Sequence, residues 1–251
     1  MEGGYRNLFD TSKASQLNGL PIGGQFKFMI MGSSTMANIA PIIQDECKTK
    51  AKEILQVTFP ACEPFYPTTI SRWKCSIKLK EYHEAVRDEK PDYLIMGARF
   101  LNLGDPLAEN ITDFEYDPVI AVAREQLREY LKHVSKKIVI LHAYPRPHIE
   151  NLGKLVGYFR SRMTPNEIDR IVVEPLTDGY ELARQRYDLL LKECGDKCDF
   201  LDYSTIFHNS TTNTVRYFNE IGLSYFTLGL HLTPIALEIA RPSIAELCKR
   251  L

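Results

Sequence analysis

The stretch FKFMIMGSSTMANIAP, residues 26–41, decides the predicted fold. It begins with a short, mainly apolar run, which predicts a buried β-strand. The run stops at Gly32, a residue that permits a sharp turn, and the segment after Ser33 and Ser34 has the apolar pattern of a helix. The stretch therefore predicts a strand, a tight turn and a helix, with two hydroxyl side chains at the turn.

Ser34 stands where a catalytic nucleophile could act. In an open α/β sheet, the turn after a strand lies at the carboxyl edge of the sheet, where ligands usually bind. The N–H groups at a helix N-terminus can stabilise an anion there. A hydroxyl that attacks an acyl carbon needs such donors and also a base. The alternative interpretation is that Ser34 is only a helix N-cap.

The rest of the chain repeats the alternation of strand and helix. Further strands are predicted at 54–58, 92–97, 137–143 and 199–203, and helices from residue 33 to about 52, at about 73–90, 117–134 and 180–194, and from Thr233-Pro234 onward. Alternation without hairpin signals favours a parallel sheet with helices on both faces. We therefore expect a three-layer α/β/α fold with a five-stranded parallel sheet, doubly wound and flavodoxin-like.

The predicted domain organisation is simple. Residues 1–25, rich in Gly, Ser and Asn, are expected to be a lead-in or linker, and residues 26–251 one domain. Within that domain, residues 148–175 are expected to be an inserted excursion that contains a helix starting at Thr164-Pro165, and residues 206–230 show no clear period.

Composition narrows the function classes. With 251 residues and 44% hydrophobic residues the chain can build a core, and its net charge of −1 does not point to nucleic acid or an anionic membrane. No apolar run reaches the roughly 18 residues that span a bilayer, and the first 20 residues are too polar for a signal peptide. Taken alone, these features predict a soluble domain.

Six cysteines leave two interpretations open. Cys62 and Cys75 flank a loop, and Cys194 and Cys198 lie close together, but neither pair carries a complete zinc ligand set. We expect no metal site. The even number suits disulfides in an oxidising compartment, and reduced buried cysteines are the alternative. The G-x-G-x-x-G and P-loop patterns are absent, so no cofactor is expected, and a phosphate- or nucleotide-binding protein is the least favoured class.

His231 is the candidate partner of Ser34. It immediately precedes the predicted cap of the last helix, so it can lie at the same sheet edge as the Ser34 turn and accept the serine proton. The alternative is a partly buried histidine that hydrogen-bonds to the backbone.

Together the two positions resemble the SGNH hydrolase pattern, with a serine after the first strand and a histidine before the final helix. The chain is more closely similar to the C-terminal SGNH domain of nematode-type membrane O-acyltransferases. This resemblance covers most of the chain and rests on the order and spacing of short motifs: Met31-Gly32-Ser33-Ser34 with Ala37-Asn38-Ile39-Ala40-Pro41, Cys62-Glu63-Pro64, Lys90-Pro91-Asp92 with Ala98-Arg99, Ala143-Tyr144-Pro145-Arg146-Pro147, and Leu223-Ser224-Tyr225-Phe226 with His231-Leu232-Thr233-Pro234.

The resemblance implies roles for individual residues. Ser34 would be the nucleophile and His231 the general base, with the Ser34 N–H as one oxyanion donor. Ala61 stands nearest to the family's glycine, the second donor. Arg99 stands where many relatives have an asparagine, and it could stabilise the oxyanion or pair with a carboxylate.

Two departures bear on activity. The usual Gly-Asp-Ser is Gly32-Ser33-Ser34 here, and the orienting aspartate expected three residues before the histidine is Leu228. Thr227 is the only polar neighbour at that place and cannot carry charge, and Asp202 is a candidate substitute from elsewhere. Loss of that carboxylate can slow a triad enzyme by about 10⁴.

The resemblance implies O-acyl transfer from an acyl donor to a hydroxyl of a sugar or lipid, or ester hydrolysis, through an acyl-serine. It implies no cofactor, a membrane acyltransferase domain normally fused at the N-terminal side, and a location on the extracellular or lumenal side of a membrane. The competing hypothesis is a catalytically weakened or inactive module that binds glycan or lipid.

Overall fold

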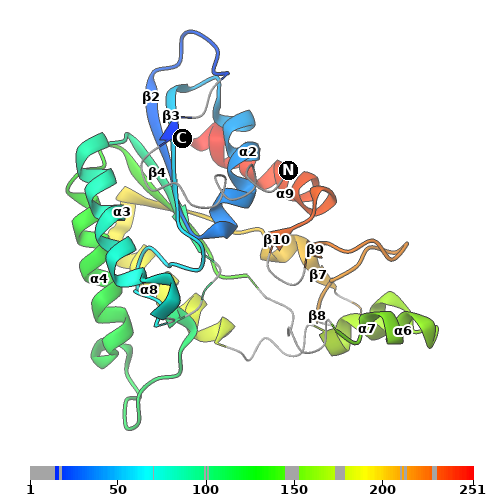
Figure 1. The fold of residues 1–251 in the computed structure, drawn as a ribbon. Helices are drawn as coiled ribbons and strands as arrows, with labels where there is room; N and C mark the ends of the chain where they lie inside the picture. The colour runs from blue at the N-terminus through cyan, green and yellow to red at the C-terminus, as the bar shows by residue number, and fades with distance from the viewer. Residues whose placement is uncertain are drawn as a thin grey trace.

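The computed structural model describes residues 15–16, 19–69, 71–98, 100, 102–144, 153–172, 179–209, 211, 214–227 and 231–251. Its centre is a sheet of five parallel strands in the order β3-β2-β4-β5-β6 (Figure 1). The strands are β2 (Phe26–Gly32), β3 (Ala51–Thr58), β4 (Tyr93–Gly97), β5 (Lys137–Leu141) and β6 (Cys198–Leu201). The predicted five-stranded parallel sheet is confirmed.

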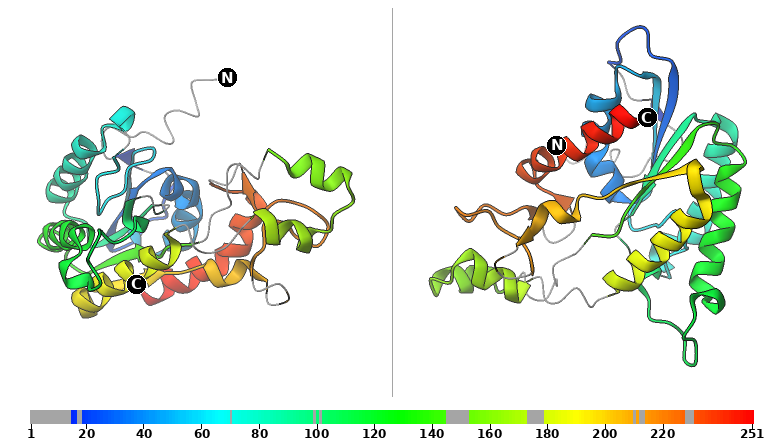
Figure 2. Two further views of the ribbon diagram at one scale, coloured as in Figure 1. Left: turned by 90° about the horizontal axis from the view of Figure 1, so that it is seen from below. Right: turned by 180° about the vertical axis from the view of Figure 1, so that it is seen from behind.

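Helices cover both faces of this sheet (Figures 1 and 2). Helices α2 (Ser34–Cys47) and α9 (Pro234–Arg250) pack on one face, and α3 (Cys75–Glu89), α4 (Pro118–Leu131) and α8 (Tyr180–Cys194) on the other. Because side chains alternate along a strand, β2 sends Phe28 and Ile30 into one core and Met29 and Met31 into the other. The predicted three-layer α/β/α fold is therefore confirmed.

The edge of the sheet carries one further strand. β1 (Ser15–Gln16) pairs antiparallel with Leu55 and Gln56 of β3, so part of the expected lead-in is hydrogen-bonded to the sheet. The division into a lead-in at residues 1–25 and a domain at 26–251 stays a prediction.

The first helix is shorter than predicted. It ends at Cys47 rather than near residue 52, and Ala51 and Glu53 already pair with β2. The N–H groups of Gln25 and Phe26 donate to the Lys50 carbonyl, which fixes the turn that leads into β3. Pairing with a neighbouring strand thus overrides the local helix pattern at this point.

The segment that showed no period contains two small hairpins. β7 (His208–Asn209) pairs with β8 (Thr214–Val215), and β9 (Phe226–Thr227) pairs with β10 (His231–Leu232). No signal in the sequence marked these pairs, because strands of two residues are too short to show an alternating pattern.

The remaining helices are short. The excursion contains α6 (Leu155–Arg160) and α7 (Pro165–Val172), and Thr164 and Glu167 form the expected capping box of α7. Single 3₁₀ turns lie at η1 (Ser71–Trp73), η2 (Asn102–Gly104), η3 (Phe114–Tyr116), η4 (Gly195–Lys197) and η5 (Ser204–Phe207). In the part of the chain described, no helix combines the length and the apolar character needed to cross a membrane.

All six cysteines form disulfides: Cys62–Cys75, Cys194–Cys198 and Cys47–Cys248. The alternative of reduced cysteines is therefore wrong. The third bond joins residues 201 positions apart and connects the C-terminal ends of α2 and α9. Both helices begin near the carboxyl edge of the sheet, so the bond fixes the far end of this helix pair.

We expect the double variant Cys47→Ala with Cys248→Ala to lose about 5 kcal/mol of unfolding free energy, because this disulfide closes a loop of 201 residues in the unfolded chain. The control is Cys194→Ala with Cys198→Ala, whose separation is 4 and whose expected loss is about 2 kcal/mol. Guanidinium denaturation of the oxidised proteins measures both losses. Equal losses in the two variants would contradict the expectation.

Asp169 ties the excursion to the body of the protein. Its buried carboxylate accepts a hydrogen bond of 2.8 Å from the N–H of Tyr217, and the N–H of Phe218 and the side chain of Asn209 also donate to it. Burial, only partly offset by these donors, raises the pKa of Asp169 to about 6.

Asp169→Asn is predicted to change the pH dependence of stability. The pKa of Asp169 in the folded protein lies above its ordinary value of 3.8, so its stabilising contribution is complete below 3.8 and is lost as the pH rises through about 6. The unfolding free energy of the wild type minus that of the variant should therefore rise by about 1 kcal/mol between about pH 7.5 and about pH 5. Urea denaturation at both pH values measures it. A difference that does not change with pH would refute the assignment.

Candidate active site

The side chains of Ser34 and His231 meet at the carboxyl edge of the sheet. The Oγ atom of Ser34 lies 2.9 Å from Nε2 of His231, although the two residues are 197 positions apart. Ser34 is the first residue of α2 and follows β2, while His231 lies in β10, two residues before Thr233, the cap of α9. Both residues are half-buried. The structure thus brings together the two residues that the sequence selected, and their catalytic roles stay a prediction.

The helix cap is Ser33 rather than Ser34. The Oγ atom of Ser33 accepts a hydrogen bond of 3.3 Å from the N–H of Thr35, and its own N–H donates to the Gly97 carbonyl at 3.1 Å. The alternative interpretation of Ser34 as an N-cap is therefore wrong. Since Ser33 takes this role, the Ser34 hydroxyl is available to His231.

The turn before these serines requires a glycine. Gly32 has φ +145°, and a Cβ atom placed on it would lie 1.8 Å from the carbonyl oxygen of Gly97. A side chain at this position would push apart the ends of β2 and β4. Gly32 therefore permits the close strand contact that sets the position of the following serines.

Asn38 connects the two halves of the site. Its Oδ1 atom accepts from the N–H of Leu232 at 2.9 Å, and its Nδ2 atom donates to the Leu232 carbonyl at 3.3 Å. Asn38 lies four residues after Ser34, on the same side of α2, and Leu232 directly follows His231. These two hydrogen bonds hold β10 against α2. The role of Asn38 was not predicted, although its spacing of four residues from Ser34 was a usable signal in the sequence.

Thr227 braces the hairpin that carries His231. The two residues are paired across β9 and β10, and the Thr227 hydroxyl donates to the His231 carbonyl at 3.3 Å. This contact reaches the backbone of His231. A contact of Thr227 with substrate stays a prediction.

Ala61 has the backbone conformation that glycine favours. Its φ is +58°, in the left-handed region, and its carbonyl accepts a hydrogen bond of 2.9 Å from the Thr68 hydroxyl. This agrees with its place opposite a glycine in the resemblance. The predictions for Arg99 and Leu228 lie outside the described residues.

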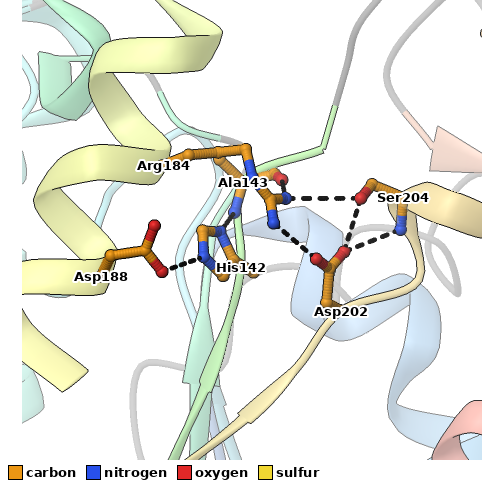
Figure 3. Close-up of polar contacts among 6 residues, drawn as sticks. All are labelled: His142, Ala143, Arg184, Asp188, Asp202 and Ser204. Carbon is orange, nitrogen blue, oxygen red and sulfur yellow. Dashed lines mark hydrogen bonds and ion pairs between the residues drawn. The ribbon is translucent and has the colours of Figure 1, made fainter. Parts of the chain in front are cut away.

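Asp202 is bound by Arg184 and Ser204 (Figure 3). Its carboxylate accepts from Arg184 at 2.7 Å, from the Ser204 N–H at 2.9 Å and from the Ser204 hydroxyl at 2.6 Å. Burial alone would raise the pKa of Asp202, but these donors outweigh it and lower the pKa below its usual value. The structure therefore does not support Asp202 as a substitute for the orienting aspartate.

His142 lies in the same region, and its hydrogen bonds give it a structural role. Its Nδ1 atom accepts from the Ala143 N–H at 2.9 Å, which places its proton on Nε2, 3.0 Å from Asp188 Oδ1 (Figure 3). Burial lowers the pKa of His142 and favours this neutral form. Together with the Arg184–Asp202 pair, it fastens the ends of β5 and β6 to α8.

The described residues do not bring together side chains that could bind a metal ion. Among the described residues, no group of three or more His, Cys, Asp or Glu side chains could hold a metal ion.

The fold is similar to that of two solved structures, a lipopolysaccharide acetyltransferase domain and a putative lipase. The periplasmic domain of a lipopolysaccharide acetyltransferase from Salmonella ser. Paratyphi A has a TM-score of 0.57 at 12% identity, over 91% of this chain and 85% of that one. A putative GDSL-like lipase from Parabacteroides merdae ATCC 43184 has a TM-score of 0.51 at 11% identity, over 92% of this chain and 99% of that one. At these identities the likeness shows the fold alone.

The sequence comparison identifies the family. No curated protein sequence matches the chain. Residues 8–246, nearly the whole chain, match the family described as "SGNH domain (fused to AT3 domains)". The chain therefore belongs to the family of SGNH domains that occur fused to AT3 domains.

Proposed function

We propose that this protein is an O-acyltransferase or esterase that works through an acyl-serine at Ser34. The observation that carries the proposal is the 2.9 Å contact between Ser34 Oγ and His231 Nε2. A nucleophile and a base within hydrogen-bond reach are the minimum arrangement for covalent acyl transfer. The family match and the fold of the two similar structures support the same chemistry.

In the proposed reaction, Ser34 Oγ attacks the acyl carbon while its proton passes to His231 Nε2. The bond from the acyl carbon to the leaving oxygen then breaks, and His231 returns the proton to that oxygen. A hydroxyl acceptor or water next attacks the acyl-serine and gives its proton to His231. The bond to Ser34 breaks and Oγ regains a proton, which restores the site.

The oxyanion would form beside the N-terminus of α2. The N–H groups of the first helical turn have no acceptor within the helix, and the helix dipole favours negative charge there. We assign the Ser34 N–H as one donor. The Ala61 N–H and the Arg99 side chain are the further donors that the family resemblance supplies.

The imidazole is oriented without the usual aspartate in this proposal, because Leu228 stands at that place. The two hydrogen bonds between Asn38 and Leu232, and the one that Thr227 donates to the His231 carbonyl, hold the backbone that carries the ring. Because the aspartate of a complete triad is absent from its usual place, we expect slower turnover than in a complete triad.

The proposed substrates are a small acyl group from an acyl donor and a hydroxyl of a sugar or lipid. A membrane acyltransferase domain is the proposed partner, in line with the AT3 fusion in the family description. The extracellular or lumenal side of a membrane is the proposed location, which the pairing of all six cysteines in disulfides supports.

A catalytically inactive module that binds glycan or lipid is the second candidate. Two observations favour it: Leu228 replaces the expected aspartate, and Asp202 is bound to Arg184. In such a module, ligand binding would survive Ser34→Ala and His231→Ala, and the wild type would show no turnover.

Labelling with a fluorophosphonate probe tests the nucleophile. The wild type should be labelled covalently, and Ser34→Ala should lose the label completely because the reacting oxygen is gone. Ser33→Ala is the matched control: it loses a helix cap worth about 1 kcal/mol but keeps the reacting hydroxyl, so labelling should persist. An unlabelled wild type, or labelling that persists in Ser34→Ala, would reject the enzyme and leave the binding module.

Asn38→Ala tests the positioning of His231. Without the two hydrogen bonds to Leu232, the second-order rate constant for fluorophosphonate labelling should fall by about tenfold or more, because a small displacement of a base is costly. Asn38→Asp keeps the acceptor for the Leu232 N–H and should recover part of the rate. Circular dichroism at the labelling temperature checks the fold. A rate equal to that of the wild type in Asn38→Ala would show that the clamp has no role in catalysis.

A further inference from the structure

Two neighbouring segments stand away from the sheet on the side of the small hairpins. One is the α6–α7 arm, residues 153–172, and the other is the loop 217–225, which appears in orange beside the arm in Figures 1 and 2. Phe159 of α6 packs edge-to-face against Phe218 with ring centroids 5.1 Å apart, and its ring lies close to Gly222. The arm and the tip of the loop therefore form one surface.

This surface carries an apolar patch of four side chains. Val156 is 62% exposed, Phe159 40%, Ile221 80% and Leu223 45%. Val156 and Phe159 are three residues apart on α6, and Ile221 and Leu223 flank the glycine that Phe159 approaches. The exposed apolar side chains thus lie on two adjoining tips.

The other side of α6 is partly buried. Leu155 and Tyr158 pack against the core that contacts α2 and α9, whereas Val156 and Phe159 are exposed. Solvent-exposed clusters of this kind mark an interaction site.

The charge around the patch indicates its partner. Exposed cations lie before, at the end of and after α6, at Lys154, Arg160 and Arg162. In the described part of the arm, Glu167 is the exposed acid, and its carboxylate is bound in the capping box of α7. The loop adds one exposed acid, Glu220. The surface is locally basic, although the whole chain carries a net charge of −1.

We infer that this surface docks on an anionic lipid bilayer. The four apolar side chains would enter the headgroup region, and the cations around them would contact lipid phosphates. Apolar tips surrounded by Lys and Arg are the usual composition of a segment that lies in a membrane interface.

The docking surface is connected to the catalytic hairpin. Asp169 of the arm holds the Tyr217 N–H, and the Tyr217 hydroxyl donates to the Phe226 carbonyl at 3.2 Å. Phe226 pairs with Leu232, the residue after His231. Docking therefore sets the position of the Ser34–His231 site relative to the bilayer. A catalytic benefit from this position rests on the proposed function, whereas the docking itself does not.

Vesicle sedimentation with the full chain tests the inference. Wild type should sediment with vesicles of phosphatidylcholine and phosphatidylglycerol more than with phosphatidylcholine alone, and added salt should weaken the binding. Phe159→Ser with Ile221→Ser should lower the partition coefficient by about tenfold or more, since two apolar anchors are removed. Ile77→Ser, at a 57% exposed position on α3 on the other face of the sheet, is the matched control and should bind like the wild type.

The outcomes separate this inference from the proposed function. Ser34→Ala should bind vesicles like the wild type, so a failure of probe labelling leaves the docking result intact. If the wild type sediments with neither kind of vesicle, the inference is overturned, and a protein surface is left as the partner of the patch. Equal loss of binding in the Ile77 variant and in the Phe159 and Ile221 variant also overturns it, because the binding would then not be specific to the patch.

Discussion

The pairing of α2 with α9 is the contact on which the site depends. These helices lie side by side on one face of the sheet, and both run from the site to the Cys47–Cys248 disulfide. At a rise of about 1.5 Å per residue, the disulfide lies about 20 Å along α2 from Ser34. A covalent bond at one end and the Asn38–Leu232 clamp at the other leave the helices little freedom to slide, so the hydroxyl and the imidazole stay in register.

The contacts that hold His231 differ from those of a complete catalytic triad. The backbone at His231 is held by hydrogen bonds with Asn38 and Thr227. Arg184 binds Asp202, and His142 faces Asp188, so these groups fasten β5 and β6 to α8 (Figure 3). These pairs stabilise the frame, and hydrogen bonds to the backbone of β10 help to position His231 beside Ser34.

The irregular segment before α9 combines two tasks. Its final hairpin presents His231, and its loop 217–225 joins the α6–α7 arm in an exposed apolar surface. Asp169 of the arm accepts a hydrogen bond from Tyr217, and Tyr217 donates one to Phe226 of the hairpin. The arm is therefore connected to the hairpin that carries His231. A region without regular periodicity is thus the one that links the site to the surroundings of the protein.

Local pattern alone determined the layers of this protein. Apolar runs ending in turns placed the five strands, and the caps at Thr164 and Thr233 marked helix starts correctly. The Ser34 turn and the position of His231 were visible for the same reason, since each signal lies within a few residues of chain.

Tertiary structure decided everything that joins distant residues. The hydrogen bond from the Ser33 N–H to the Gly97 carbonyl joins two separate strand ends, and the clamp by Asn38 depends on a strand 194 positions away. The Cys47–Cys248 bond spans 201 positions. Sequence periodicity reports which face of an element is buried, but it does not report which distant backbone group will lie opposite a given side chain. Only the winding of the sheet and the packing of α2 on α9 bring those groups within hydrogen-bond distance.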